Sequence, residues 1–238
     1  LSLRRQREMC IRDSFQGDDG TNGNELWKSD GTASGTVMVK DINPSYNSGS
    51  PSELTVAGST LYFRANDGSN GQELWMSDGT DSGTLMVKDI WSGYNSGNPT
   101  GITSFGQSIV FQAQDDYSNR ELWISDGTFS GTLMVRDINT VGDSSPGGFV
   151  EFNGEIYFTA DNGTNGFELW KTDGTFSGTV MLKDIYNGYS SSSPSNFAVA
   201  NGMLYFSAND GITGNEVWVT DGTEAGTKLA KDVISGSY

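Results

Sequence analysis

Apolar and polar residues alternate in short runs along this chain, and the pattern returns every 47 or 48 residues. One full period, residues 51–98, contains four strand-like stretches: PSELTVAG, TLYFRAND, QELWMSD and LMVKDI. β-Branched and aromatic residues fill these stretches, and the Asp-Gly and Asn-Gly pairs between them supply the positive φ angles of tight turns. Each period therefore predicts four antiparallel strands joined as a meander, named A to D in chain order.

Large apolar groups occupy both faces of the predicted strands. In strand C, Leu74 and Trp75 point to opposite faces, and in strand B Leu61 and Tyr62 do the same. A sheet that is apolar on both faces must be covered on both, and stacking identical sheets around an axis achieves this. The sequence therefore predicts an all-β protein, a β-propeller with blades of about 48 residues. A parallel β-helix is the main rival, but the hairpin turns argue against it.

The predicted units span approximately residues 15–50, 51–98, 99–145, 146–193 and 194–238. The first unit lacks strand A and most of strand B. We therefore interpret the array as a fragment, an incomplete ring whose expected partners are additional blades of the same full-length chain and whose unpaired strand edges favour association. Residues 1–14 fit nowhere in the repeat and contain the single cysteine, Cys10. We interpret them as a non-native or unstructured segment.

The charge balance narrows the classes of function. The chain has 30 acidic and 14 basic residues, a net charge of −16, which disfavours nucleic acid and anionic lipid as partners. No apolar run is long enough to cross a membrane, so we expect no membrane insertion. Histidine is absent, and the sequence has no nucleophile elbow, phosphate loop or metal cluster of familiar ligand spacing. These features predict a protein that is not an enzyme.

Five nearly identical phrases carry a resemblance to a known family. They read ELWKSDGT, ELWMSDGT, ELWISDGT, ELWKTDGT and EVWVTDGT, and the only departure from the leading pattern is Val217 in place of leucine. The array resembles the ELWxxDGT repeat of large bacterial exported proteins. The resemblance implies a propeller found in secreted or surface proteins, hence an extracellular or cell-surface location, and it attaches no activity.

The repeated phrase itself is best interpreted as structural. Residues that are identical in every blade are expected to serve the packing that all blades have in common. Asp78 and Thr80 are expected to cap the turn at Gly79, and Glu73 is expected to pair across strands with Lys88. The tryptophans are expected to form the repeat core. They are Trp27, Trp75, Trp123, Trp170 and Trp218.

The acidic loop between strands B and C is a candidate calcium site, because Ca²⁺ prefers six to eight hard oxygen ligands. Its spacing is not that of an EF-hand, and turn-forming Asp and Asn explain the same residues, so the sequence predicts no cofactor beyond this calcium hypothesis. The candidate ligands are Asp19, Glu25, Asp67, Glu73, Asp115, Glu121, Asp161, Glu168, Asp210 and Glu216.

In a meander, the B–C loops lie on the same rim as the connections from strand D to the next strand A. These connections contain aromatic residues beside polar acceptors, a combination that suits a glycan or protein ligand. The candidate rim residues are Tyr46, Tyr94, Tyr189, Trp91 and Tyr186. The sequence therefore favours a non-catalytic binding or structural module. The alternative is part of a propeller hydrolase or lyase whose catalytic residues lie outside this chain.

Overall fold

The computed structural model describes residues 13–117 and 119–233, and within these ranges every regular element is a β-strand. Blade by blade, the strands are β1 (Ser14–Asp18), β2 (Asn24–Lys28) and β3 (Val37–Lys40); β4 (Ser52–Ala57), β5 (Thr60–Asn66), β6 (Gln72–Ser77) and β7 (Leu85–Lys88); β8 (Thr100–Phe105), β9 (Ser108–Gln114), β10 (Arg120–Ser125) and β11 (Leu133–Arg136); β12 (Gly147–Phe152), β13 (Glu155–Asp161), β14 (Phe167–Thr172) and β15 (Val180–Lys183); β16 (Ser195–Ala200), β17 (Met203–Asn209), β18 (Asn215–Thr220) and β19 (Lys228–Lys231). Within the described ranges there is therefore no helix that could span a membrane.

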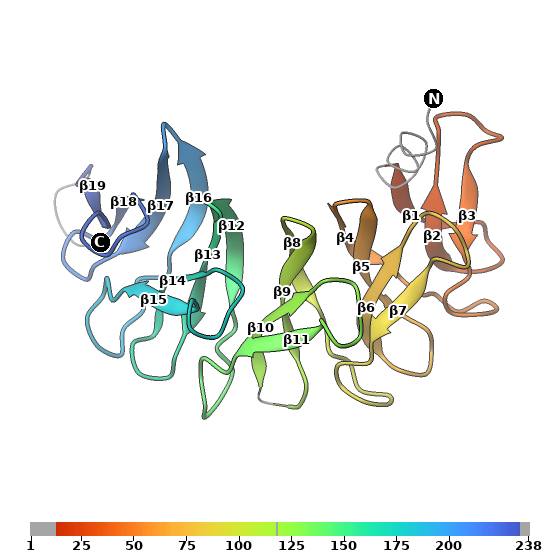
Figure 1. Cartoon of the computed structure of the whole chain (residues 1–238), viewed down its shortest axis with the longest axis horizontal. Helices are drawn as coiled ribbons and strands as arrows, with labels where there is room; N and C mark the ends of the chain where they lie inside the picture. The colour runs from red at the N-terminus through yellow and green to blue at the C-terminus, as the bar shows by residue number, and fades with distance from the viewer. Residues whose placement is uncertain (1–12, 118, 234–238) are drawn as a thin grey trace. The chain divides into compact units, whose positions relative to one another are not determined.

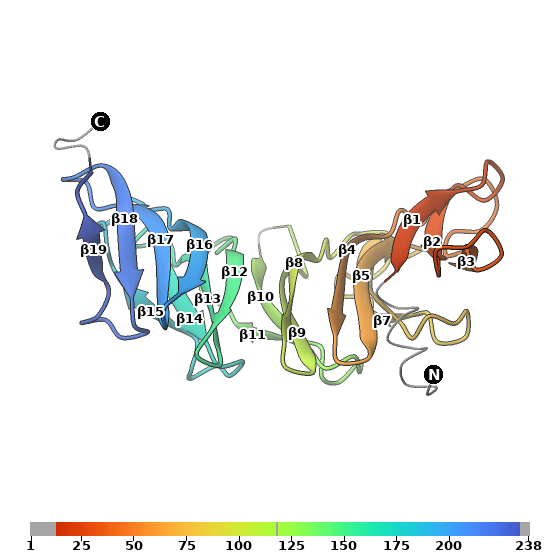
Figure 2. The ribbon, with the colours of Figure 1, turned by 90° about the horizontal axis from the view of Figure 1, so that it is seen from above.

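Each sheet is a meander of neighbouring antiparallel strands (Figure 1). Four sheets have four strands in chain order, as Figure 2 shows for β16 to β19, and the first has three described strands. A β-bulge between Leu74 and Trp75 shifts the register of β6 against β7, so that Leu74 lies opposite Lys88 and Trp75 opposite Met86. The predicted meander and its period are confirmed.

Strand B of the first blade is present, contrary to the prediction. β1 pairs with β2 along its whole length, from Ser14 opposite Lys28 to Asp18 opposite Asn24. The prediction that residues 1–14 lie outside the fold is therefore wrong for Ser14. It was missed because the apolar pattern of strand B begins only at Phe15. Residues 1–12, including Cys10, lie outside the described residues.

The chain divides into two compact units. The first unit consists of residues up to Tyr117 together with Trp123–Leu133, and it contains the first two blades and most of the third. The second unit consists of Ser118–Leu122 and the residues from Met134 onward, and it contains the last two blades. Each unit has its own hydrophobic core.

Both cores form where one blade packs on the next. In the first unit, Leu26 of blade 1 packs with Phe63 and Trp75 of blade 2. In the second unit, Leu169 of blade 4 packs with Trp218 of blade 5. Apolar side chains from both faces of a sheet are buried, as the sequence pattern required. The repeat tryptophans are buried in blades 2 to 5, and Trp27 is half-buried.

The DGT part of the repeated phrase builds a self-capped turn. The backbone N–H of Thr80 donates to Asp78 Oδ1 at 3.0 Å, and the N–H of Gly83 donates to Thr80 Oγ1 at 3.0 Å. A Cβ atom on Gly83 would collide with the Asp78 carboxylate, so this position accepts only glycine without rearrangement. The predicted capping role of Asp78 and Thr80 is confirmed.

The DGT turns of blades 2 to 5 also receive a basic side chain from the preceding blade. Lys88 Nζ donates to the carbonyl oxygen of Thr132 at 2.7 Å and lies 4.9 Å from the centre of the Phe129 ring. A neutral acceptor and an aromatic face both suit an ammonium group. The same contact with a threonine carbonyl oxygen recurs from Arg136 to Thr179 and from Lys183 to Thr227. At blade 2, Lys40 of blade 1 instead forms an ion pair with the Asp81 carboxylate of the turn, at 3.0 Å. The basic residue of strand D therefore ties each of these blades to the next.

Candidate binding site on the loop rim

A buried glutamate organises the rim of each blade. Glu73, in β6, is fully buried, and its two carboxylate oxygens accept hydrogen bonds from opposite ends of the β7–β8 connection. Oε2 accepts the N–H of Ile90 at 2.8 Å, and Oε1 accepts the N–H of Gly97 at 2.5 Å. One side chain therefore closes the connection into a fixed loop and satisfies two backbone donors that would otherwise be buried without partners.

The other glutamates of the repeated phrase also accept hydrogen bonds from the backbone of their D–A connections. Glu25 accepts the N–H groups of Ile42 and Gly49, at 2.8 and 2.6 Å. In Glu121 and Glu168 the second partner is a serine, whose hydroxyl also donates to the carboxylate; the pairs are Glu121 with Ser144 at 2.5 Å and Glu168 with Ser192 at 2.6 Å. Glu216 accepts the N–H of Val233 at 3.0 Å.

The predicted pairing of Glu73 with Lys88 is wrong. The β-bulge places Lys88 opposite Leu74, and its ammonium group extends to the next blade instead. The glutamate faces inward to the loop backbone. The spacing of Glu73 and Lys88 along the chain suggested a cross-strand ion pair. The β-bulge that prevents this pair has no clear signal in the sequence.

Burial changes the acidity of these glutamates. It raises the pKa of the Glu73 carboxyl from 4.5 to about 7, and the nearby Asp89 carboxylate adds to the increase. Burial also raises the pKa of Glu25, Glu121 and Glu168. Backbone hydrogen bonds oppose this effect because they favour the ionised form, but the loss of solvation is larger.

This acidity predicts a fold that is more stable in mild acid than at neutral pH. A carboxyl whose folded-state pKa exceeds its unfolded value binds more protons in the native state, so the free energy of unfolding falls as pH rises between the two values. For Glu73 that window runs from 4.5 to about 7. Thermal unfolding at high salt, which screens the net negative charge, should give a higher Tm at about pH 5 than at about pH 7.

Glu73→Gln removes one titrating group and provides the control. The Tm of this variant should change less between pH 5 and pH 7 than the Tm of the native chain. At still lower pH the trend should reverse, because hydrogen bonds from Asn22 and Thr21 lower the pKa of Asp19, and carboxylates of this kind stabilise the fold only when ionised. A Tm that rises steadily from pH 5 to pH 7 would contradict the assignment.

The aspartates of the B–C loops cap their own turns. Asp67 Oδ1 accepts the N–H groups of Ser69 and Asn70, both at 2.8 Å, and Asp210 accepts those of Ile212 and Thr213. In the blade 4 loop Asn162 takes this capping position, while Asp161, one residue earlier, accepts the N–H of Gly163.

The predicted calcium ligands are not brought together. In residues 13–117 and 119–233 no three acidic side chains gather closely enough to hold a metal ion. The glutamates of the predicted set face the D–A connection through Ile90 and its equivalents. The loop aspartates Asp19, Asp67, Asp161 and Asp210 accept backbone N–H groups of their own turns. Both kinds of carboxylate thus bond to backbone, and the structure gives the calcium hypothesis no support among the described residues.

The B–C loop and the D–A connection contact one another, as the meander predicts. The N–H of Gln72 donates to Ser96 Oγ at 3.0 Å, and the N–H of Asn98 donates to the Gln72 carbonyl oxygen at 3.0 Å. Gly71 adopts a φ of +70°, and a Cβ atom there would collide with the carbonyl oxygen of Asn95. The two segments therefore form one continuous surface, called the loop rim below.

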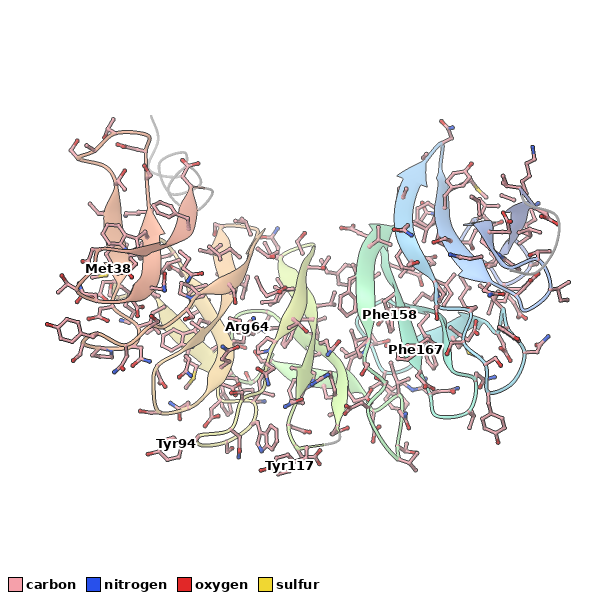
Figure 3. All side chains as sticks on the ribbon, turned by 180° about the vertical axis from the view of Figure 1, so that it is seen from behind. Met38, Arg64, Tyr94, Tyr117, Phe158 and Phe167 are labelled. Carbon is pink, nitrogen blue, oxygen red and sulfur yellow. The ribbon has the colours of Figure 1, made fainter. Side chains whose placement is uncertain are left out.

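In the first unit the loop rim presents exposed aromatic rings. Tyr46 and Tyr94 are exposed on the connections, as predicted. Trp91 is half-buried and meets Tyr117 edge to face, with ring centres 4.6 Å apart. Figure 3 shows the side chains of Tyr94 and Tyr117 on loops at the same edge of the molecule. Sequence reasoning did not single out Tyr117, because it stands in the B–C loop that departs most from the repeat.

In the second unit the loop rim contains a polar pocket of about 310 Å³. Its lining residues carry only hydroxyl and amide groups, and they come from the β15–β16 connection, the start of β16, the end of β17 and the start of β18. They are Ser191, Ser192, Ser193, Ser195, Asn209 and Asn215. Tyr189, two residues before the pocket, is 87% exposed, and Tyr186 is half-buried against Gly211.

Sequence reasoning missed this pocket, which we call the serine pocket. A signal was available, since the run SSSSPS departs from the other connections. Where blades 1 and 2 have Gly49 and Gly97 beside the buried glutamate, this connection has Ser192. The run was instead interpreted as ordinary loop composition, because serine is common in turns.

No family model and no curated protein matches this sequence. Solved structures do match. Prolyl oligopeptidase B from Galerina marginata is 11% identical with a TM-score of 0.53, over 95% of this chain and 38% of that one. A puromycin-hydrolyzing peptidase from Mycobacterium tuberculosis is 11% identical with a TM-score of 0.52, over 91% of this chain and 37% of that one. The β-propeller domain of the Trilobed protease from Pyrococcus furiosus is 14% identical with a TM-score of 0.48, over 91% and 66%.

This chain spans less than two fifths of the length of the first two solved proteins. At such identities the likeness concerns the fold alone. The fold itself is shown by the repeated four-stranded meanders and by the cores that form where one meander packs on the next: the chain is an all-β array of β-propeller blades.

Proposed function

We propose that this chain is a non-catalytic binding module that recognises a glycan through the loop rim of its second unit. The observation that carries the proposal is the serine pocket, which is lined entirely by serine and asparagine and preceded, two residues earlier in the chain, by the exposed ring of Tyr189. Serine hydroxyls and asparagine amides each donate and accept hydrogen bonds, as do the hydroxyl groups of a sugar. An exposed aromatic ring offers an apolar face against which a sugar ring can pack.

The charge of the chain narrows the ligand class further. A net charge of −16 repels anionic polysaccharides, so a neutral glycan is the favoured ligand. The pocket lining contains no charged side chain that would select an acidic or basic sugar. The resemblance to ELWxxDGT repeats of exported proteins supports an extracellular or cell-surface location, where such glycans are found.

The proposal predicts that the pocket edge matters for binding and the opposite rim does not. On a neutral glycan that retains the native chain, Tyr189→Ala should weaken binding about tenfold, because a buried contact of this kind contributes about 1 to 2 kcal/mol. Phe176→Ala is the matched control. Phe176 is also an exposed aromatic loop residue of the second unit, but it stands in the β14–β15 loop, at the other end of the strands.

Isothermal titration calorimetry or affinity electrophoresis measures both effects, with thermal melts to verify folding. Equal affinities for the native chain and Tyr189→Ala would remove Tyr189 from the site. Retention by a protein ligand and by no glycan would replace the glycan in the proposal with a protein partner.

A second candidate function comes from the solved structures. The prolyl oligopeptidase and the puromycin-hydrolyzing peptidase described above match with TM-scores above 0.5, which favours the alternative that this array accompanies a hydrolase domain. Under this alternative the array itself would carry no catalytic residue. Peptide turnover by the full-length product of the coding sequence, absent when the array is expressed alone, would support it.

A further inference from the structure

An aromatic pair on the loop rim of the first unit departs from the repeat. Trp91 follows Ile90 in the β7–β8 connection, and it is the only one of the six tryptophans that stands outside the repeated phrase. Its ring meets that of Tyr117, in the B–C loop of blade 3, with centres 4.6 Å apart and planes at 87°. Both residues belong to the first unit and stand in interior blades, so the pair does not depend on the ends of the chain.

The pair replaces a contact that is polar where blade 1 meets blade 2. There Asn43 takes the place of Trp91 and lies against a glycine of the next B–C loop, since a Cβ atom on Gly68 would be 2.6 Å from Asn43 Oδ1. In the loop of blade 3, Asp116 replaces that glycine and Tyr117 follows it. Both segments of one contact have therefore changed, and two rings meet where an amide meets a glycine.

The two rings form an open corner. Tyr117 is 88% exposed, and Trp91 is half-buried. Because the ring planes are nearly perpendicular, the edge of one ring meets the face of the other, and the ring that presents its edge keeps both of its own faces uncovered by the pair. An aromatic face carries the negative part of the ring quadrupole and attracts a cation. The corner is thus suited to a positively charged group.

Cations on aromatic faces already recur within this chain. Lys88 Nζ lies 4.9 Å from the centre of the Phe129 ring, and Arg136 Cζ lies 5.0 Å from that of Phe176. In both cases the basic group also donates a hydrogen bond to a carbonyl oxygen of the neighbouring turn. Ring faces provide no acceptor of that kind, so the corner favours a cation without N–H groups. A quaternary ammonium group spreads its charge over methyl groups, which need no acceptor.

The charges of the two segments that carry the rings also favour a cation. Residues 89–98 and 114–120 contain three acidic residues and one basic residue, which are Asp89, Asp115, Asp116 and Arg120. Their net charge is therefore −2, within a chain whose net charge is −16. This field attracts a cation and repels an anion.

We propose that the corner formed by Trp91 and Tyr117 binds the quaternary ammonium group of an organic ligand. The methyl groups of the ligand pack on the ring faces, and the rings and the neighbouring carboxylates stabilise its charge. The site shares no residue with the serine pocket, so its test is independent of the test for glycan binding.

Titration calorimetry of the purified chain with choline chloride, at constant ionic strength, tests the proposal. The matched probe is the neutral carbon isostere of choline, in which a tert-butyl group replaces the trimethylammonium group. We expect choline to bind and the isostere to bind more weakly by about fivefold or more, because only the cation is attracted to the ring faces. Absence of choline binding, or equal affinity for the two probes, would overturn the proposal.

Variants of Tyr117 locate the site. Tyr117→Leu removes one ring and should weaken choline binding by about fivefold or more, whereas Tyr117→Phe keeps the ring and should bind as the native chain does. Tyr46→Ala is the matched control, because Tyr46 is an equally exposed tyrosine of the same unit in the connection that has Asn43 in place of Trp91. Thermal melts verify folding. Native affinity in Tyr117→Leu, or an equal loss in Tyr46→Ala, would overturn the assignment.

Flotation with vesicles of phosphatidylcholine distinguishes the source of the ammonium group. Capture of the native chain and not of Tyr117→Leu would identify a lipid headgroup as the ligand. Choline binding without capture would identify a soluble ligand with the same group.

Discussion

Replacing Glu73 with alanine should lower the free energy of unfolding by about 3 to 5 kcal/mol, the largest loss expected from any single exposed or buried carboxylate of the rim. The substitution removes both acceptors from the β7–β8 connection. The N–H groups of Ile90 and Gly97, which now donate to Glu73 at 2.8 and 2.5 Å, would be left without partners in a buried setting. Each unpaired buried donor costs about 1 to 3 kcal/mol, and the cavity adds to that.

Urea denaturation of Glu73→Ala measures this loss, and Glu151→Ala is the matched control. Glu151 is an exposed glutamate of β12, so its replacement should change the free energy of unfolding by less than about 0.5 kcal/mol. If the two variants were equally stable, the glutamate of the repeated phrase would not be the element that holds the rim. The result would then reopen a functional interpretation of that residue.

Replacing Gly71 with alanine should cost about 3 kcal/mol or more, for two separable reasons. Gly71 has a φ of +70°, which strains any residue with a Cβ atom. That Cβ atom would also collide with the carbonyl group of Asn95 and lie 2.7 Å from Ser96 Oγ, both in the D–A connection. A backbone obstacle cannot move aside as a flexible side chain can, so the loop and the connection must separate.

Gly93→Ala isolates the first reason from the second. Gly93 has a φ of +84°, but a Cβ atom there meets nothing within 4 Å. Its replacement should therefore cost only the strain, about 1 kcal/mol. Chemical denaturation of both variants gives the difference, which measures the contact between the B–C loop and the D–A connection. Equal losses would mean that this contact does not hold the two segments of the rim together.

The parts of the fold that follow from local chemistry could be predicted from the sequence. Alternation at period 2 and the Asp-Gly turns placed the strands, and apolar residues on both faces required stacked sheets. The capping by Asp78 and Thr80 could be predicted because it acts within one turn. Strand B of the first blade was partly missed, since Ser14 carries no apolar signal.

The parts that depend on contacts distant in sequence could not be predicted in the same way. The partner of Glu73 is a backbone N–H 24 residues away at Gly97, and backbone groups leave no residue-type signal. Lys88 finds its acceptor 44 residues away, in the next blade. The serine pocket likewise joins Ser191 to Asn209 and Asn215, which only the stacking of blades brings together.

These contacts explain why the chain repeats one phrase five times. The glutamate closes the rim connection, the tryptophan fills the space between blades, and the DGT turn receives the basic residue of the preceding blade. Because these positions are needed for folding in every blade, they cannot vary to recognise a ligand. Residues that differ between blades, such as Asn215 where blade 2 has Gln72 and blade 4 has Phe167, stand on the rim that the shared residues hold in place.

The central claim is that a uniform scaffold presents a variable, non-catalytic binding rim. One measurement tests it most directly: passage of the native chain over a panel of immobilised neutral polysaccharides, with retention and released sugar recorded on the same columns. We expect retention on at least one polysaccharide with no release of sugar from any of them. Release of sugar by this chain alone, or failure to be retained on every column, would contradict the account.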